Sequence, residues 1–163
     1  ALFDLMISTK EDISIHLILH WHRLLFQSTR PDIAGKIREH QVAISGSKFL
    51  PPSPVEIMPL ISDFFRWYNK NKAKTHPVEL AALVHLKFVT IHPFSDGNGR
   101  ISRLLMNHVL NRSKHPLLNI HYEGRDSYYT ALERSQTKNL DFIFVHWFVK
   151  RYIKENQRFI RKK

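Results

Sequence analysis

The chain has 163 residues, 43% of them hydrophobic, and a formal net charge of +11. This length suits a single domain, 1–163, and a domain of this size buries about 70% of the surface that its unfolded chain exposes. The absence of cysteine excludes a disulfide framework and a thiolate metal site. There is no run of about 18 apolar residues and no signal-peptide pattern, so we expect a cytoplasmic protein without a membrane partner.

The positive charge gathers at one end of the chain. Between Lys150 and Lys163 stand seven basic residues and one acid, Glu155, a net charge of +6. A basic helix end is usually solvated and suits the negative pole of the helix dipole. We therefore do not expect nucleic acid as a partner, although a basic helical nucleic-acid-binding module stays open as an alternative.

Apolar residues recur with helical spacing through most of the chain. The expected helices are, in chain order, 14–26, 53–70, 76–91, 98–112, 126–136 and a basic C-terminal helix over 140–163. Capping-box spacing places the first start at Ser8, with Asp12 as the other choice. Ser53 is the expected N-cap of the second helix, with Glu56 closing its box, and Asp126 caps the shorter helix.

The third of these segments is apolar on nearly all sides, which predicts a central, buried helix. Between the first two helices, "HQVAIS" alternates weakly and is bounded by Gly46 and the pair Pro51 and Pro52. This pattern predicts a short β-hairpin or an extended flap. The expected fold class is all-α, a compact bundle of about six to eight helices with one flap near the active site.

The stretch "HPFSDGNGRISR", 92–103, interrupts the helical pattern. Gly97, Asn98 and Gly99 can turn their amides toward an anion at the electropositive start of the following helix. Arg100 and Arg103 are three residues apart and can bind further phosphate oxygens.

Two more residues of this stretch carry chemistry. Asp96 would repel a phosphate unless a cation lies between them, and Mg²⁺ takes one or two carboxylates together with phosphate oxygens. His92 has an unperturbed pKa suited to proton abstraction at neutral pH. A plain helix junction would explain Asp96 and Gly97, but not the whole set.

These residues resemble the motif of the Fic (filamentation induced by cyclic AMP) family. That motif runs histidine, proline, phenylalanine, any residue, acid, glycine, asparagine, glycine, arginine, two residues, arginine, and every fixed position is matched within 92–103. The likeness extends over about residues 10–150. It implies the Fic fold and transfer of AMP from ATP, with Mg²⁺, to a serine, threonine or tyrosine hydroxyl of a target protein.

The resemblance also implies a role for each motif residue. His92 would be the general base, and Asp96 would hold Mg²⁺ between the α- and β-phosphates. Arg100 and Arg103 would neutralise the β- and γ-phosphates. Gly97, Asn98 and Gly99 would form the anion hole, with the Asn98 side chain on the α-phosphate.

Outside the motif, the resemblance implies a flap over Arg38–Lys48 that pairs with a backbone segment of the target. The residues expected to dock the target are Val42, Ala43, Ile44 and Ser45. The adenine would stack on Tyr128 and Tyr129, with Leu132 alongside, unless these tyrosines only fill the core. Gln136 stands where relatives often have an asparagine that contacts adenine.

Many Fic proteins carry an inhibitory helix whose glutamate pairs with the second motif arginine. Glu123 and Glu155 have the required following residue, but asparagine and arginine stand where serine or threonine is expected four positions earlier. We expect an inhibitory helix upstream in cis, an inhibitor or antitoxin in trans, or none. A homodimer is left open.

Other chemistries of the family stay open, among them removal of AMP and transfer of phosphocholine. Phosphoryl transfer is disfavoured, because Doc-like members have lysine where this chain has Gly99. A separate set of histidines, His16, His20 and His22, is expected to form a solvated or hydrogen-bonded helix face and not a zinc site.

Overall fold

The computed structural model describes residues 2–120 and 125–160, and all its regular elements are helices. They are α1 Leu2–Ser8, α2 Ile15–Phe26, α3 Pro54–Asn71, α4 Pro77–Ile91, α5 Asn98–Arg112, α6 Arg125–Lys138, α7 Asp141–Glu155 and α8 Gln157–Ile160. The expected all-α class is therefore confirmed for the described residues. None of these helices is long and apolar enough to cross a lipid bilayer.

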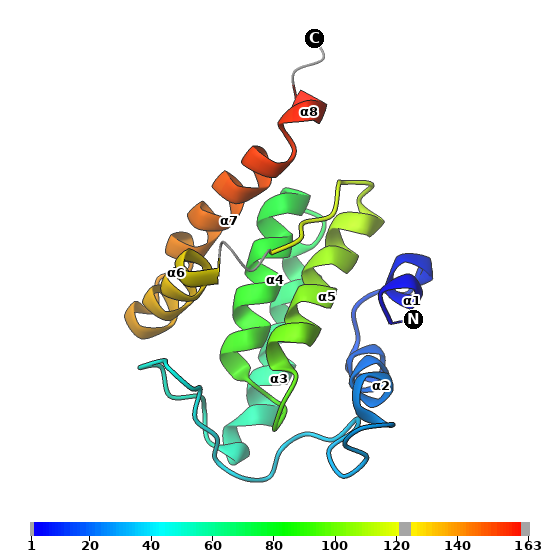
Figure 1. Ribbon diagram of the computed structural model, residues 1–163, viewed down its shortest axis with the longest axis vertical. Coiled ribbons are helices and arrows are strands. Elements are labelled where there is room, and N and C mark those ends of the chain that lie inside the picture. Colours follow the sequence, from blue (N-terminus) through cyan, green and yellow to red (C-terminus); the bar gives the residue numbers. More distant parts are fainter. Residues whose placement is uncertain (1, 121–124, 161–163) are drawn as a thin grey trace.

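Helices α4 and α5 form the centre of the bundle (Figure 1). They pack on each other, while α3 and α7 pack on α4, and α1 and α2 pack on α5. Ten of the fifteen residues of α4 are buried, as its nearly uniform apolar pattern predicts. The junction between α4 and α5 therefore lies at one end of the bundle, held between two layers of helices.

Helix starts follow local capping chemistry, and the expected starts at Ser53 and Asn98 are correct. The Ser53 backbone N–H donates to Glu56 Oε2 over 2.7 Å, as the capping box requires. Helix α3 then continues through Pro59 without a break.

Three expected helix ends are wrong. Helix α2 is capped by Ser14, whose hydroxyl accepts from the Leu17 N–H, and not by Ser8 or Asp12. Helix α6 already includes Arg125, so Asp126 lies in its first turn and does not cap it. The C-terminal helix expected over 140–163 is divided, because α7 ends at Glu155.

The expected β-hairpin is also wrong, because the described part of the chain contains no strand. From Gln41 to Ser45 exposed and half-buried residues alternate, as they would in a strand, but no second strand pairs with this segment in the part described. The Ser47 N–H donates to Ile44 O over 3.1 Å, and Gly46 has φ 75°. The segment is an extended flap with a tight turn at its tip.

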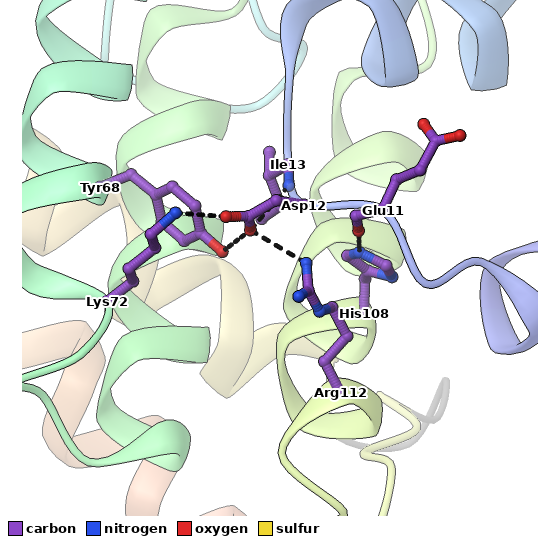
Figure 2. A network of polar contacts seen from close by, with 7 residues as sticks. All are labelled: Glu11, Asp12, Ile13, Tyr68, Lys72, His108 and Arg112. Carbon is purple, nitrogen blue, oxygen red and sulfur yellow. Dashed lines mark hydrogen bonds and ion pairs between the residues drawn. The ribbon is translucent and has the colours of Figure 1, made fainter.

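A polar network fixes the N-terminal segment to the bundle (Figure 2). Its members are Glu11, Asp12, Ile13, Tyr68, Lys72, His108 and Arg112. The Asp12 carboxylate accepts from the Tyr68 hydroxyl over 2.7 Å and pairs with Lys72 and with Arg112. Buried His108 bonds the Glu11 carbonyl oxygen over 2.8 Å. The linker between α1 and α2 is thereby tied to both α3 and α5.

Candidate active site

His92 ends α4 in a left-handed conformation, with φ 52° and ψ 56°. Its Nδ1 lies 3.1 Å from the Val89 carbonyl oxygen, which can only accept a hydrogen bond. In the neutral imidazole Nδ1 therefore carries the proton, and Nε2 carries the lone pair. The side chain is half-buried and lines a cavity of about 660 Å³. This is the tautomer that a general base acting through Nε2 needs.

Burial lowers the pKa of His92 from its ordinary value, and the positive charge of Arg38 lowers it further. The bond to Val89 raises it in part. The net direction is downward, so the imidazole is neutral, and able to accept a proton, at neutral pH.

The loop that follows His92 is held from inside by Asn98. Its Oδ1 accepts from the Phe94 N–H over 2.9 Å, and its Nδ2 donates to Phe94 O over 2.8 Å. The side chain is 3% exposed. Both ends of the Asn98 amide hold the loop, and the contact of this side chain with a phosphate stays a prediction.

Gly97 is the N-cap of α5, and two features of the structure require glycine there. Its φ is 82°, which disfavours any residue with a Cβ. A Cβ at this position would lie 2.6 Å from Cε2 of Phe26. Gly99, two residues further, lies beside Arg103, whose Nη1 would be 3.3 Å from an added Cβ.

Asp96 and Arg100 form an ion pair outside the cavity wall. Asp96 Oδ1 accepts from the Gly97 N–H and from Arg100 Nη2, the latter over 3.2 Å. The Arg100 guanidinium lies 4.7 Å from the centre of the Phe26 ring. Arg100 therefore does not line the cavity beside Arg103, as three-residue spacing had suggested, because Phe26 and Asp96 draw it aside.

The donor set at Asp96 fits a magnesium ion that is brought in by a nucleotide. The carboxylate is 56% exposed, and both of its contacts use Oδ1. Mg²⁺ keeps several waters and needs only one or two carboxylates when phosphate oxygens complete its shell. Within the described residues no group of three or more histidine, aspartate or glutamate side chains gathers as a protein-only metal site, His16, His20 and His22 included.

Arg103 is placed by a chain of buried hydrogen bonds. The Tyr128 hydroxyl bonds the Arg103 side chain and lies 2.9 Å from His85 Nε2. Tyr128 is 2% exposed, and its ring packs against Phe144. Both tyrosines line the cavity, but Tyr128 packs mainly into the core beside Arg103, whereas Tyr129 is 55% exposed.

The remaining expected residues divide between the cavity and the flap surface. Ile44, Ser45, Leu132 and Gln136 line the cavity, and Val42 and Ala43 do not. Gln136 Nε2 donates to the Thr90 hydroxyl over 3.2 Å.

The flap tip is fastened to α6 by Glu133. Its Oε2 accepts from the Lys48 N–H over 3.0 Å, and it also bonds the Ser47 side chain. These bonds hold the pKa of the Glu133 carboxyl below its usual value. The flap thus closes one side of the cavity, and Figure 1 shows it reaching below α6.

Of the two glutamates with the required following residue, Glu155 is the one that the structure describes. Glu123 lies outside the described residues. Glu155 pairs with Arg151 over 3.0 Å at the end of α7, which lies at the opposite end of the bundle from the α4–α5 junction (Figure 1).

The model of one protein family, described as the Fic/DOC family, matches residues 12–110, more than half of the chain. The chain belongs to the Fic/DOC family. A relative from Drosophila melanogaster, named protein adenylyltransferase Fic, is 44% identical over 125 residues, which is 76% of this chain and 25% of that protein. Protein adenylyltransferase fic-1 of Caenorhabditis elegans is 37% identical over 158 residues, 96% of this chain and 30% of that protein.

Solved structures show the same fold. Residues 134–508 of C. elegans Fic-1 superpose with a TM-score of 0.81 at 35% identity, covering 98% of this chain and 47% of the other. A Fic-domain signalling protein from Bacteroides thetaiotaomicron gives 0.80 at 28% identity, covering 94% and 64%. The chain spans between a quarter and a third of the curated relatives named above, so it corresponds to one part of them.

The Fic motif did not reveal the residues that support it from elsewhere in the chain. His22 is fully buried, bonds the Asp96 carbonyl oxygen over 3.0 Å and stacks on Phe94 at 3.7 Å. The Gly35 N–H donates to His22 Nδ1, which places the His22 proton on Nε2. Arg38 bonds the His92 carbonyl oxygen over 2.8 Å. The sequence placed His22 with His16 and His20 on a solvated or hydrogen-bonded helix face and gave no sign of its contact with the motif.

Proposed function

We propose that this chain is the catalytic domain of a Mg²⁺-dependent protein adenylyltransferase. It transfers AMP from ATP to a serine, threonine or tyrosine hydroxyl of a target protein and releases pyrophosphate. The observation that carries the proposal is the juxtaposition of His92, in its Nδ1-protonated tautomer, with Gly99 and Arg103 on the wall of one cavity. The names of relatives 44% and 37% identical to the chain support the same activity.

The cavity suits a nucleotide in size and charge. Its volume of about 660 Å³ falls within the roughly 300–1,000 Å³ typical of small-molecule sites. The backbone N–H groups of Asn98 and Gly99 lie in the first turn of α5, where no carbonyl of the helix can accept from them. They are therefore suited to bind a phosphate. The Gly97 amide already bonds Asp96. Arg103 supplies a guanidinium for the outer phosphates.

The reaction follows from these positions. His92 Nε2 takes the proton of the target hydroxyl, the hydroxyl oxygen forms a bond to the α-phosphorus, and the bond from that phosphorus to the bridging oxygen of pyrophosphate breaks. The amides at the α5 N-terminus stabilise the charge on the α-phosphate, and Arg103 stabilises the departing pyrophosphate. Asp96 would hold the Mg²⁺, whose charge offsets that of the phosphates.

The flap is suited to hold the target. Gln41–Ser45 is extended, and within the described part of the chain no strand pairs with it, so its backbone can add a strand of the target. Ile44 and Ser45 line the cavity, which brings such a strand next to the nucleotide. On the adenine side Tyr129 offers an exposed ring for stacking, and Gln136 offers an amide.

Two labelled nucleotides test the proposal. The protein is incubated with MgCl₂, a cell extract and ATP labelled at either the α- or the γ-phosphate. Adenylyl transfer predicts label in protein from the α position alone. Label from the γ position alone identifies phosphoryl transfer and contradicts the proposal, as does the absence of protein-bound label from both.

A further inference from the structure

We propose that Arg38 is a positioning residue that joins the catalytic histidine and both ends of the flap into one rigid unit. The inference rests on the proposed function, because it assigns Arg38 a part in the transfer reaction. Arg38 touches neither the cavity nor any group expected to react. It acts through the backbone of His92 and of the flap.

The Arg38 guanidinium binds three separate carbonyl groups. Its Nε donates to His92 O over 2.8 Å, Nη1 to His40 O over 2.9 Å, and Nη2 to Pro52 O over 2.6 Å. The backbone N–H of Arg38 adds a fourth bond, to Pro93 O over 3.0 Å. A planar fork with donors on three nitrogens meets this arrangement, and a lysine ammonium does not.

The Arg38 side chain is buried where it makes these hydrogen bonds. Arg38 is 3% exposed, and none of its hydrogen bonds within the described residues goes to a carboxylate. Burial lowers the pKa of its guanidinium, although an arginine remains charged at neutral pH. A buried cation without a counter-ion is costly unless its donors are satisfied, so it is weak as a source of stability. We therefore assign to Arg38 the positioning of the backbone groups that it binds.

On one side this geometry fixes His92. A non-glycine residue at φ 52° is held in a sparsely populated backbone region. The bond from Arg38 Nε to the His92 carbonyl holds that peptide in place, while Val89 O holds Nδ1 of the same residue. Backbone and imidazole of the base are thereby fixed by separate partners.

On the other side Arg38 closes the base of the flap. His40 and Pro52 stand at its two ends, and their carbonyl oxygens meet on one guanidinium. Gln41 Nε2 adds a second cross-link by donating to Pro51 O over 2.9 Å. The same Arg38 side chain therefore fixes the position of His92 and the position of any target strand that pairs with the flap.

The experiment compares Arg38→Lys with wild type and with Lys36→Met. The lysine variant keeps the charge but cannot span three carbonyls. Lys36 is a nearby exposed cation whose side chain bonds, within the described residues, the Asp32 carbonyl oxygen and no other group, so its removal tests for a general charge effect. Displacement of reacting groups by about 1 Å costs about 10²-fold in rate. We expect Arg38→Lys to lose about that factor in kcat with the KM for ATP unchanged, and Lys36→Met to match wild type.

Amide hydrogen exchange of residues 41–50 supplies a readout that needs no activity. Arg38→Lys should speed exchange in the flap and leave α3 protected, whereas Lys36→Met should not. In wild type, the Arg38 Nε proton should exchange slowly and couple by NMR to the His92 carbonyl carbon. This measurement tests the hydrogen bond between Arg38 and His92 without any variant.

The outcomes separate the two proposals. If wild type transfers no α-label, the proposed function fails. The exchange and NMR data then still test whether Arg38 holds His92 and the flap together. A rapidly exchanging Arg38 Nε proton, or an Arg38→Lys protein with wild-type kcat and flap protection, would overturn the inference. If Arg38→Lys does not fold, the wild-type NMR measurement decides.

Discussion

Substituting Gly97 by alanine is expected to destabilise the protein through two separable effects. The first is conformational, because φ 82° costs a residue with a Cβ about 1–2 kcal/mol. The second is steric, because the new Cβ would lie 2.6 Å from Phe26 Cε2 and 3.3 Å from Leu25 Cδ2. Overpacking of this kind costs about 1–3 kcal/mol.

Together these effects predict a loss of about 2–5 kcal/mol in the free energy of unfolding, out of roughly 5–15 kcal/mol for a typical domain. In a chain of this size each kcal/mol lowers the Tm by about 2–4 °C. Thermal and urea unfolding followed by circular dichroism measure the change. The α5 N-terminus must shift to relieve the contact, so ATP binding should weaken too.

Gly46→Ala is the matched control. Gly46 has φ 75°, but no atom lies within 4 Å of the position of its missing Cβ. It therefore carries the conformational cost alone, about 1–2 kcal/mol. If Gly97→Ala unfolds at the same temperature and urea concentration as Gly46→Ala, the close packing of Phe26 against the loop is refuted.

Three further predictions concern stability and the flap. Burial lowers the pKa of His85 to about 3, so between pH 6.5 and 3 the unfolded chain binds a proton that the folded chain does not. The free energy of unfolding should therefore fall by about 2 kcal/mol from pH 6.5 to 4.5, and a His85→Asn protein should show a shallower fall in urea titrations at the two pH values. Glu133→Ala removes the acceptor of the Lys48 amide, so exchange at the flap tip should accelerate with an unchanged Tm, and equal exchange rates would contradict the fastening. Asp12→Asn weakens partly exposed ion pairs and should lower the free energy of unfolding in urea by about 1 kcal/mol without changing ATP binding. A larger change in the free energy of ATP binding than in that of unfolding would contradict this and show that the network influences the nucleotide site.

What the sequence could predict was local. The capping box at Ser53 and the buried pattern of α4 depend on neighbours within one or two helical turns, and both were correct. The Fic motif likewise concentrates its chemistry in twelve consecutive positions, so its residues were found together.

The contacts that could not be predicted join residues that are far apart in the sequence or depend on how a side chain turns. Asn98 turns inward because Phe94 offers it both a donor and an acceptor, which spacing alone does not reveal. Tyr128 is buried because its hydroxyl finds His85 from α4. Arg38 and His22 come from segments 54 and 74 residues away from the carbonyls that they bond. The flap has the alternation of a strand but no partner within the described residues, so a pattern of period two did not become a hairpin.

The central claim is that the α4–α5 junction is a nucleotide site at which His92 acts as the base. The direct measurement compares wild type, His92→Ala and His146→Ala, the last removing an exposed histidine of α7. For each protein, calorimetry measures ATP binding with Mg²⁺, and label from α-labelled ATP measures transfer. We predict that His92→Ala binds ATP like wild type but transfers at least about 10²-fold more slowly, while His146→Ala does both normally. Undiminished transfer by His92→Ala would contradict it.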